Sequence, residues 1–160
     1  MKQTTVLLAL LAILFASCQN DAKLFSGSYS YKTSGKVILQ SGTSEASYQL
    51  TNKIGQLKVI TIKSANNDSV LLVMNEMGGS VITLRAKVLE DSIFITPYTR
   101  STFLLLGDSI QGNFTINITG NGIMYDKFII LNEIYDGKLD NDSTETTIHG
   151  DNILTVAERN

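Results

Sequence analysis

The chain has 160 residues, with 13 basic and 15 acidic side chains, one cysteine, one histidine, one proline and no tryptophan. A single cysteine excludes an intramolecular disulfide and a zinc site built on several cysteines. A mildly acidic chain without a basic stretch is a poor match for nucleic acid or an anionic membrane surface, so no nucleic-acid partner is expected.

The first 17 residues have the features of a bacterial export signal. Lys2 precedes Val6 to Ala16, an uncharged stretch that suits a signal peptide and is too short to span a membrane. The run ends in Leu14-Phe15-Ala16-Ser17-Cys18, which resembles a bacterial lipobox, although Phe15 stands where an aliphatic residue is commoner. The alternative is an ordinary secretory signal that ends by chance in a cysteine.

The lipobox resemblance implies that Cys18 is acylated, with fatty acids such as palmitate, and becomes the first residue of the mature chain. Several acyl chains make such an anchor permanent. The expected location is the bacterial cell envelope, with the domain held on the outer membrane and facing the periplasm or the cell surface. We divide the chain into a signal peptide (1–17), a flexible tether (18–26) and a single all-β domain (27–160).

Beyond the tether, apolar residues alternate with polar ones at the spacing of half-buried strands. This pattern covers Ile60–Ile62, Ile82–Val88, Ile93–Ile95 and Phe114–Ile118. Two continuous apolar runs, Val70–Met74 and Phe128–Leu131, indicate strands covered on both faces. No window shows a convincing helical stripe.

Turn-forming residues separate these segments at short intervals. We expect turns at Gly78-Gly79, Glu90-Asp91 and Asp136-Gly137, and Asn121-Gly122 is the strongest hairpin signal. Pro97 is expected to close a strand, and Gly150-Asp151-Asn152 to form a closing hairpin. About nine or ten strands result, an antiparallel meander that should form a barrel or a two-layer sandwich, because an open sheet would expose its edges.

The residues offer little for catalysis. His149 lies in a predicted turn, where an exposed turn residue is the favoured interpretation over a general base or ligand. No nucleophile elbow, phosphate-binding glycine loop or histidine pair at metal spacing is present. Asp136, Asp140 and Asp142 resemble a calcium loop only loosely. We therefore expect no catalytic residues, no metal site, no cofactor and no enzyme activity.

Asp-Ser followed by an apolar or β-branched residue recurs along the chain. This tripeptide resembles the O-glycosylation sequence of Bacteroidetes envelope proteins, which would place glycans on Ser69, Ser92, Ser109 and Ser143. The alternative is that Asp and Ser form a turn before each new strand. Tyr29 and Tyr31 share a sheet face, where packing at the rim of a core is favoured over a binding platform.

The lipobox, the length and the string of hairpins together resemble the small calycin-like or lipocalin-like β-barrel lipoproteins of Bacteroidetes. The Gly-x-Trp motif of lipocalins is missing, since the chain has no tryptophan. The expected function is a non-catalytic interaction or structural module that docks onto an envelope protein. The alternative is a calycin-like binding protein for a small apolar ligand, whose ligand-facing candidates are Ile82, Leu84, Phe114, Ile116 and Ile118.

Overall fold

The computed structural model describes residues 21–160 except 51, 64–67, 80, 107–109, 142 and 144. The signal peptide, Cys18 and Ser109 lie outside the described residues. In chain order the elements are α2 (Asp21–Phe25), β1 (Gly27–Ser34), β2 (Lys36–Ser41), β3 (Ser44–Gln49), β4 (Lys53–Ile62), β5 (Ser69–Glu76), β6 (Val81–Leu89), β7 (Ser92–Leu106), β8 (Ile110–Tyr125), β9 (Phe128–Leu139) and β10 (Thr147–Arg159). Within the described part, no helix is long and apolar enough to cross a bilayer.

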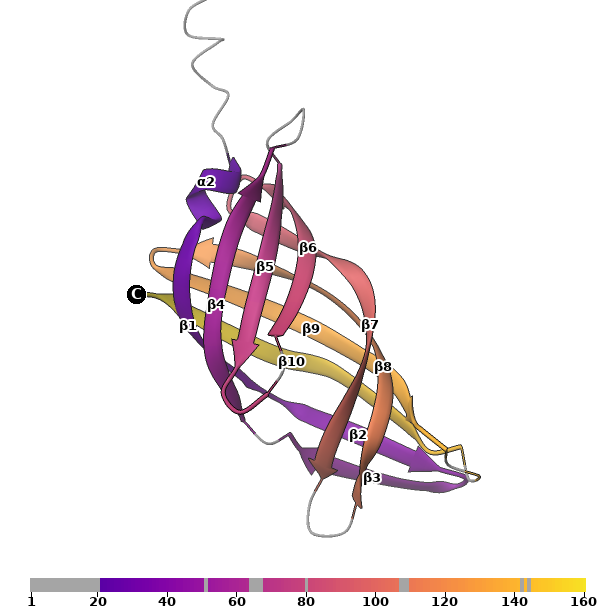
Figure 1. The fold of residues 1–160 in the computed structure, drawn as a ribbon. Helices are drawn as coiled ribbons and strands as arrows, with labels where there is room; N and C mark the ends of the chain where they lie inside the picture. The colour runs from indigo at the N-terminus through magenta and orange to yellow at the C-terminus, as the bar shows by residue number, and fades with distance from the viewer. Residues whose placement is uncertain are drawn as a thin grey trace, which may run out of the picture.

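The strands form one antiparallel barrel (Figure 1). The order β1-β4-β5-β6-β7-β8-β9-β10 is closed by pairing between β1 and the C-terminal half of β10. The hairpin of β2 and β3 pairs with the first residues of β10 and extends the sheet beyond the barrel. The all-β prediction is confirmed, and of the two predicted architectures the chain adopts a closed eight-stranded barrel with two extra strands.

Two predicted hairpins are wrong because the strands are longer than expected. β8 runs through Asn121-Gly122, and the chain turns instead at Asp126, whose φ is 55°. Gly122 is required by close packing, since a Cβ there would lie 2.2 Å from the Ile130 carbonyl oxygen of β9. β10 likewise continues through residues 150–152, where a bulge replaces the expected hairpin.

Some of the other turn predictions are confirmed and others are wrong. The chain does turn at Gly78-Gly79 and at Glu90-Asp91. Asp136-Gly137 instead lies within β9. Pro97 does not close a strand: it lies inside β7, at the register irregularity between Ile95 and Tyr98, where a missing N–H donor is tolerated.

The barrel core consists of two apolar clusters separated by a polar layer. One cluster lies near α2 and includes Leu131 of β9, and the other lies near β2 and includes Tyr135 of the same strand. Buried Glu133 lies between these two residues. Along β10, Thr155 occupies the same level and its hydroxyl is 2.6 Å from that of Thr33 on β1. The interior is therefore polar at mid-height and apolar on either side.

The helix α2 closes one end of the barrel, where a flexible tether had been expected. Ala22 and Phe25 are fully buried against the core. Arg159, at the end of β10, lies over the Tyr29 ring and donates to the Leu24 carbonyl at 2.5 Å and to the Tyr29 hydroxyl at 2.6 Å. The Tyr29 hydroxyl donates to the Phe25 carbonyl at 2.7 Å. These contacts fix the helix onto the barrel.

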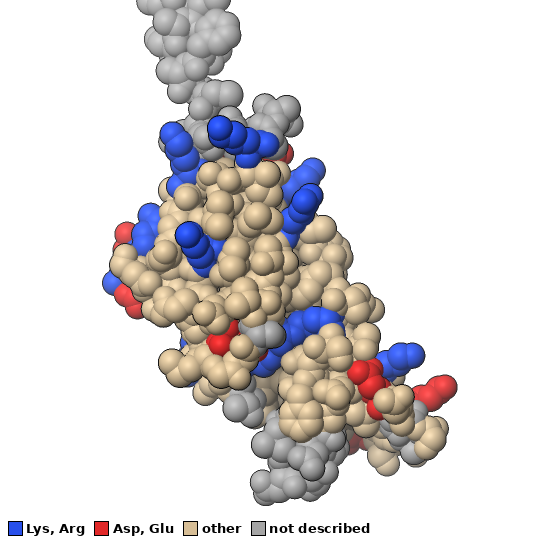
Figure 2. Space-filling view, in the orientation of Figure 1, with Lys and Arg blue, Asp and Glu red and all other residues tan. Residues whose placement is uncertain are grey.

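The outer surface is unevenly charged. Figure 2 shows basic side chains scattered over the face formed by β4, β5 and β6, with acidic ones confined to its margins.

Candidate functional site

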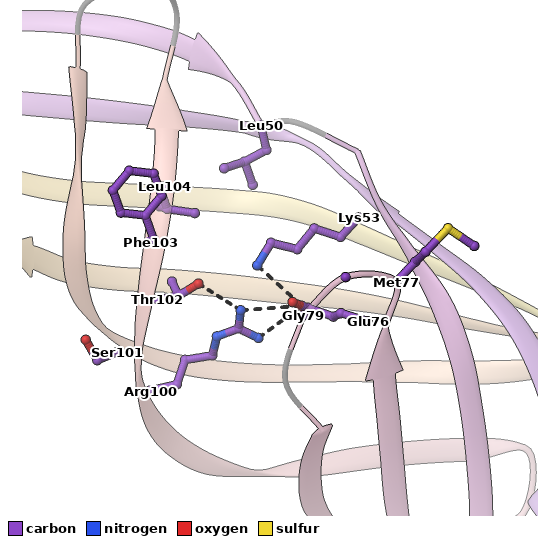
Figure 3. Close-up of a pocket in the computed structure, with 11 residues that line it drawn as sticks. Leu50, Lys53, Glu76, Met77, Gly79, Arg100, Ser101, Thr102, Phe103 and Leu104 are labelled. Atoms are coloured by element: carbon purple, nitrogen blue, oxygen red, sulfur yellow. Dashed lines mark hydrogen bonds and ion pairs between the residues drawn. The ribbon is translucent and has the colours of Figure 1, made fainter.

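A cleft opens in the barrel wall where β6 and β7 separate. These strands pair only between Ala86–Leu89 and Ser92–Ile95, and beyond the irregularity at Pro97 β7 pairs with β8 alone. Because a bulge bends its strand, β7 turns away from the first half of β6. The resulting cleft has a volume of about 500 Å³ and lies between the β5–β6 turn and residues 100–104 of β7 (Figure 3).

Two cations share one carboxylate in this cleft. Lys53 Nζ donates to Glu76 Oε1 at 3.3 Å, and both terminal nitrogens of Arg100 donate to the same oxygen at 3.4 Å. Arg100 Nη2 also donates to Thr102 Oγ1 at 3.0 Å, and Figure 3 shows these groups pointing toward one another. The side chains of Arg100 and Glu76 are each 16% exposed. The three charges sum to +1.

Glu133 lies behind this cluster in the polar layer. It is 2% exposed, and burial raises the pKa of its carboxyl to about 7. The hydrogen bond with Tyr135 and the charges of Arg100 and Lys53 lower this pKa and so offset part of the effect of burial. The Tyr135 hydroxyl donates to Glu133 Oε2 at 3.3 Å. Near neutral pH this carboxyl is therefore divided between its neutral and charged forms.

The floor of the cleft is narrow and partly polar. An enclosed space of about 10 Å³, lined by Thr33 and Tyr135 together with cleft residues, lies below it. That volume has no room for a ligand larger than a water molecule. Among the described residues the buried hydroxyl of Tyr31 has no hydrogen-bond partner, although Glu76, Arg100 and Glu133 all act on it electrostatically.

Apolar side chains form the rim and walls of the cleft. Met77 and Phe103 are 78% and 59% exposed, and Leu50 and Leu104 are buried beside them. A charged floor under an apolar rim suits a molecule with one anionic group and an apolar part.

The five residues predicted to face a ligand lie elsewhere. Leu84 belongs to the cluster near α2 and Ile82 packs against it. The other three, Phe114, Ile116 and Ile118, are fully buried in the cluster near β2. The fold does not bring the two groups together, and none of the five lines the cleft. That they face a ligand stays a prediction.

Sequence reasoning missed the cleft because its charged residues occupy inward positions. The available signal is Glu133, an acidic residue at an inward position between Leu131 and Tyr135. A second signal is the series Tyr98, Arg100, Thr102 after Pro97, which places polar groups where alternation predicts apolar ones.

His149 is exposed as predicted but lies in β10 rather than in a turn. Its ring nitrogens hydrogen-bond with Asp136 Oδ1 at 2.5 Å and with Asp151 Oδ1 at 2.6 Å. The hydrogen bond with Asp136, followed by the charge of Asp151, raises the pKa of the imidazole. With both nitrogens engaged, this histidine has no lone pair directed at a substrate.

The described residues contain no group of three or more His, Cys, Asp or Glu side chains placed to hold a metal ion. In the Asp-Ser pairs, Ser69 donates to Asp68 at 3.0 Å and Ser92 to Asp91 at 3.1 Å, which is the local hydrogen bonding typical of turns. Ser143 is exposed. Glycosylation at these serines stays a prediction.

Comparison with known proteins assigns no relative: no protein-family model matches the chain, and a search of curated proteins finds no match.

Proposed function

We propose that the chain is a lipid-anchored protein of the bacterial envelope whose barrel is a non-catalytic binding module, and that the cleft at Lys53, Glu76 and Arg100 holds a small amphipathic anion. The anchor is supported by the lipobox-like residues 14–18. The observation that carries the binding proposal is the positive charge on the floor of a cleft with an apolar rim, a charge that is in surplus while the buried Glu133 is protonated.

The donor inventory supports an anionic ligand. Arg100 has five N–H donors and Lys53 three, and Glu76 accepts from both through the single oxygen Oε1. Donors remain for a second carboxylate or a phosphate, and a planar guanidinium matches a carboxylate well. A wholly apolar ligand would desolvate these charges without pairing them, which is unfavourable. The proposal therefore modifies the expected apolar ligand by adding an anionic group.

Binding of dodecanoate below its micellar concentration tests this proposal. Residues 19–160 contain all ten strands and both core clusters of the described chain, so this chain carries the whole barrel. Dodecanoate is compared by calorimetry with dodecanol and dodecyltrimethylammonium, which share its chain but not its charge. We expect saturable binding of dodecanoate alone.

The matched variants are Arg100→Gln and Arg85→Gln, since Arg85 is an exposed arginine on the outside of β6. Losing a charge-assisted hydrogen bond worth about 2 kcal/mol weakens binding roughly 30-fold. Arg100→Gln should show this loss and Arg85→Gln should bind as the unmodified chain does. Equal binding of the cationic amphiphile, or equal affinity in both variants, would refute the proposed site.

A second candidate is docking of an envelope protein on β3, the predicted interaction module. β3 is the terminal strand of the sheet order, and five of its six residues are exposed. An unpaired strand edge is a template for strand addition. A photo-crosslinker at Ala46 should then give a discrete protein adduct in cells, whereas one at exposed Asn132 on β9 should not. Identical adduct patterns at both positions would remove this candidate.

A further inference from the structure

The outer face of β4, β5 and β6 carries basic and apolar side chains without an acidic one. Its outward charged residues are Lys58 on β4 and Arg85 and Lys87 on β6. No outward position of the three strands holds Asp or Glu, since Glu76 at the end of β5 points into the cleft. Just beyond the strand ends, Lys63 after β4 is exposed, and so is Glu90 shortly after β6. We name this surface, the outward side of β4, β5 and β6, the basic face.

The strand register interleaves the cations with apolar groups. One row across the three strands is Lys58, Val73 and Thr83, and the next is Ile60, Leu71 and Arg85. Ile60 is 38% exposed, and Val81 and Leu89, near the two ends of β6, are 62% and 63% exposed. In the view of Figure 2 the basic side chains surround uncharged surface on this face.

The opposite side of the barrel has a different charge pattern. Outward positions of β9 and β10 include Asp136, Asp151 and Glu158 alongside Lys138. The basic face is therefore a local feature of a chain that is acidic overall. The separation arises because alternation along each strand sends Lys58, Arg85 and Lys87 to the same side of the sheet.

The first described element, α2, lies at one end of this face. The helix α2 packs against β4, β5 and β6, and Asp21 is its first residue (Figure 1). Cys18 precedes Asp21 by three residues, which span about 10 Å at most when extended. An acylated Cys18 would thus hold the α2 end of these strands close to the bilayer. The separation is roughly the distance over which surface charge acts at physiological ionic strength.

We propose that the basic face docks on an anionic lipid surface, so that the anchored barrel rests on its membrane along β4, β5 and β6. Basic side chains attract anionic headgroups, and neighbouring exposed aliphatic groups enter the headgroup region. This inference concerns a different surface from the ligand cleft and does not depend on it. It differs from the expectation drawn from overall charge, which takes no account of where the basic side chains lie.

Vesicle binding of residues 19–160, which lack the anchor, tests the face itself. Sedimentation with phosphatidylglycerol–phosphatidylcholine vesicles is compared with pure phosphatidylcholine at 0.1 and 0.5 M salt. We expect binding to the anionic vesicles only, weakened by salt. Binding to both vesicle types, or to neither, would overturn the proposal.

Two triple variants with equal charge change locate the surface. Lys58→Gln/Arg85→Gln/Lys87→Gln should reduce partitioning at least tenfold, because each basic residue near an anionic surface contributes about fivefold. Lys36→Gln/Lys127→Gln/Lys138→Gln, changed on other sides of the barrel, should reduce it by less than about threefold. Equal losses would show attraction by overall charge and overturn the assignment to this face.

Further variants separate this inference from folding defects and from the cleft. Thr83→Lys adds a cation to the face and should increase partitioning into the anionic vesicles alone, whereas apolar surface exposed by a damaged fold would also bind pure phosphatidylcholine. Arg100→Gln should bind anionic vesicles normally, whatever it does to dodecanoate. A photo-crosslinker at Ile60 that captures a protein or a second copy of the chain instead of lipid would assign the face to that partner and overturn the lipid proposal.

Discussion

The buried carboxyl of Glu133 predicts a barrel that becomes less stable as pH rises from 5 to 8. Glu133 is 2% exposed, and its desolvation raises the pKa of the folded state to about 7, against 4.5 for the ordinary group. Below about pH 4.5 the folded and unfolded states both hold the proton. As pH rises further, the unfolded chain loses the proton first, so the free energy of unfolding falls until the folded carboxyl ionises as well.

The size of the effect follows from the interval between the two pKa values. At 1.36 kcal/mol for each unit, the interval from 4.5 to about 7 amounts to a loss of about 3 kcal/mol, complete above pH 7 and mostly between pH 5 and 7. That is a large fraction of the stability of a single domain. Glu133→Gln keeps the shape of the side chain and removes its ionisation, so most of this pH dependence should disappear.

Urea unfolding followed by circular dichroism at pH 5, 6, 7 and 8 measures the effect. At pH 8 Glu133→Gln should be the more stable protein, and near pH 5 the two should differ little. Glu158→Gln is the matched control, since Glu158 is half exposed and pairs with Lys127 on the surface. His149 titrates in the same range in all three proteins, so the comparison is the difference from the unmodified chain at each pH. A difference for Glu133→Gln that is constant from pH 5 to 8 would refute the reasoning.

Three further predictions follow from single contacts. NMR should show that His149 titrates above its usual pKa of 6.5. The stability that its protonated form contributes is therefore complete below pH 6.5 and is lost as pH rises through the raised pKa. Asp136→Asn should lower the pKa of His149, and an unchanged pKa would show that the hydrogen bond with Asp136 is not formed. Arg159→Met removes the contacts with Tyr29 and should lower the free energy of unfolding in urea by about 1–3 kcal/mol. It should also speed hydrogen exchange in α2, and unchanged exchange there would show that Arg159 does not hold the helix. Gly55→Ala places a Cβ 2.1 Å from a backbone oxygen of β5 and should lower both the thermal midpoint and the free energy of unfolding, the latter by about 1–3 kcal/mol. An unchanged midpoint would contradict the close approach of the two strands.

The strands were predictable because their signal is local. Alternation in Ile82–Val88 and Phe114–Ile118 is set by which face of the sheet is buried, and the structure buries Leu84, Phe114, Ile116 and Ile118. Strand ends were harder to predict. Asn121-Gly122 has the composition of a turn, but its glycine is required by the close approach of Ile130 on the next strand, β9, and this contact depends on how far the β8–β9 hairpin extends.

The position of the cleft was harder to predict than the strands. Its charged residues come from three strands, and only barrel closure and the irregularity at Pro97 place Lys53, Glu76 and Arg100 together. Alternation marks Arg100 as a polar residue at an inward position but does not show which residues of other strands meet it there. The basic face was hard to predict for the same kind of reason. Net charge includes Lys58 and Arg85, but it does not show that alternation and strand register place them on one side of the sheet.

The polar layer also bears on the choice between a binding module and an inert structural one. Burying Glu133 lowers stability at neutral pH, and replacing buried charged groups with apolar ones of similar size is commonly neutral or stabilising. A barrel that served only as a spacer would be more stable with an apolar residue at this level, between Leu131 and Tyr135. The buried carboxyl of Glu133 instead adjoins the cleft where β6 and β7 separate and solvent reaches Arg100. When Glu133 is protonated the surplus positive charge of the cleft persists, and when it ionises that charge is cancelled. The destabilising residue thus controls the electrostatic property on which anion binding would depend, which favours a binding role over a structural one.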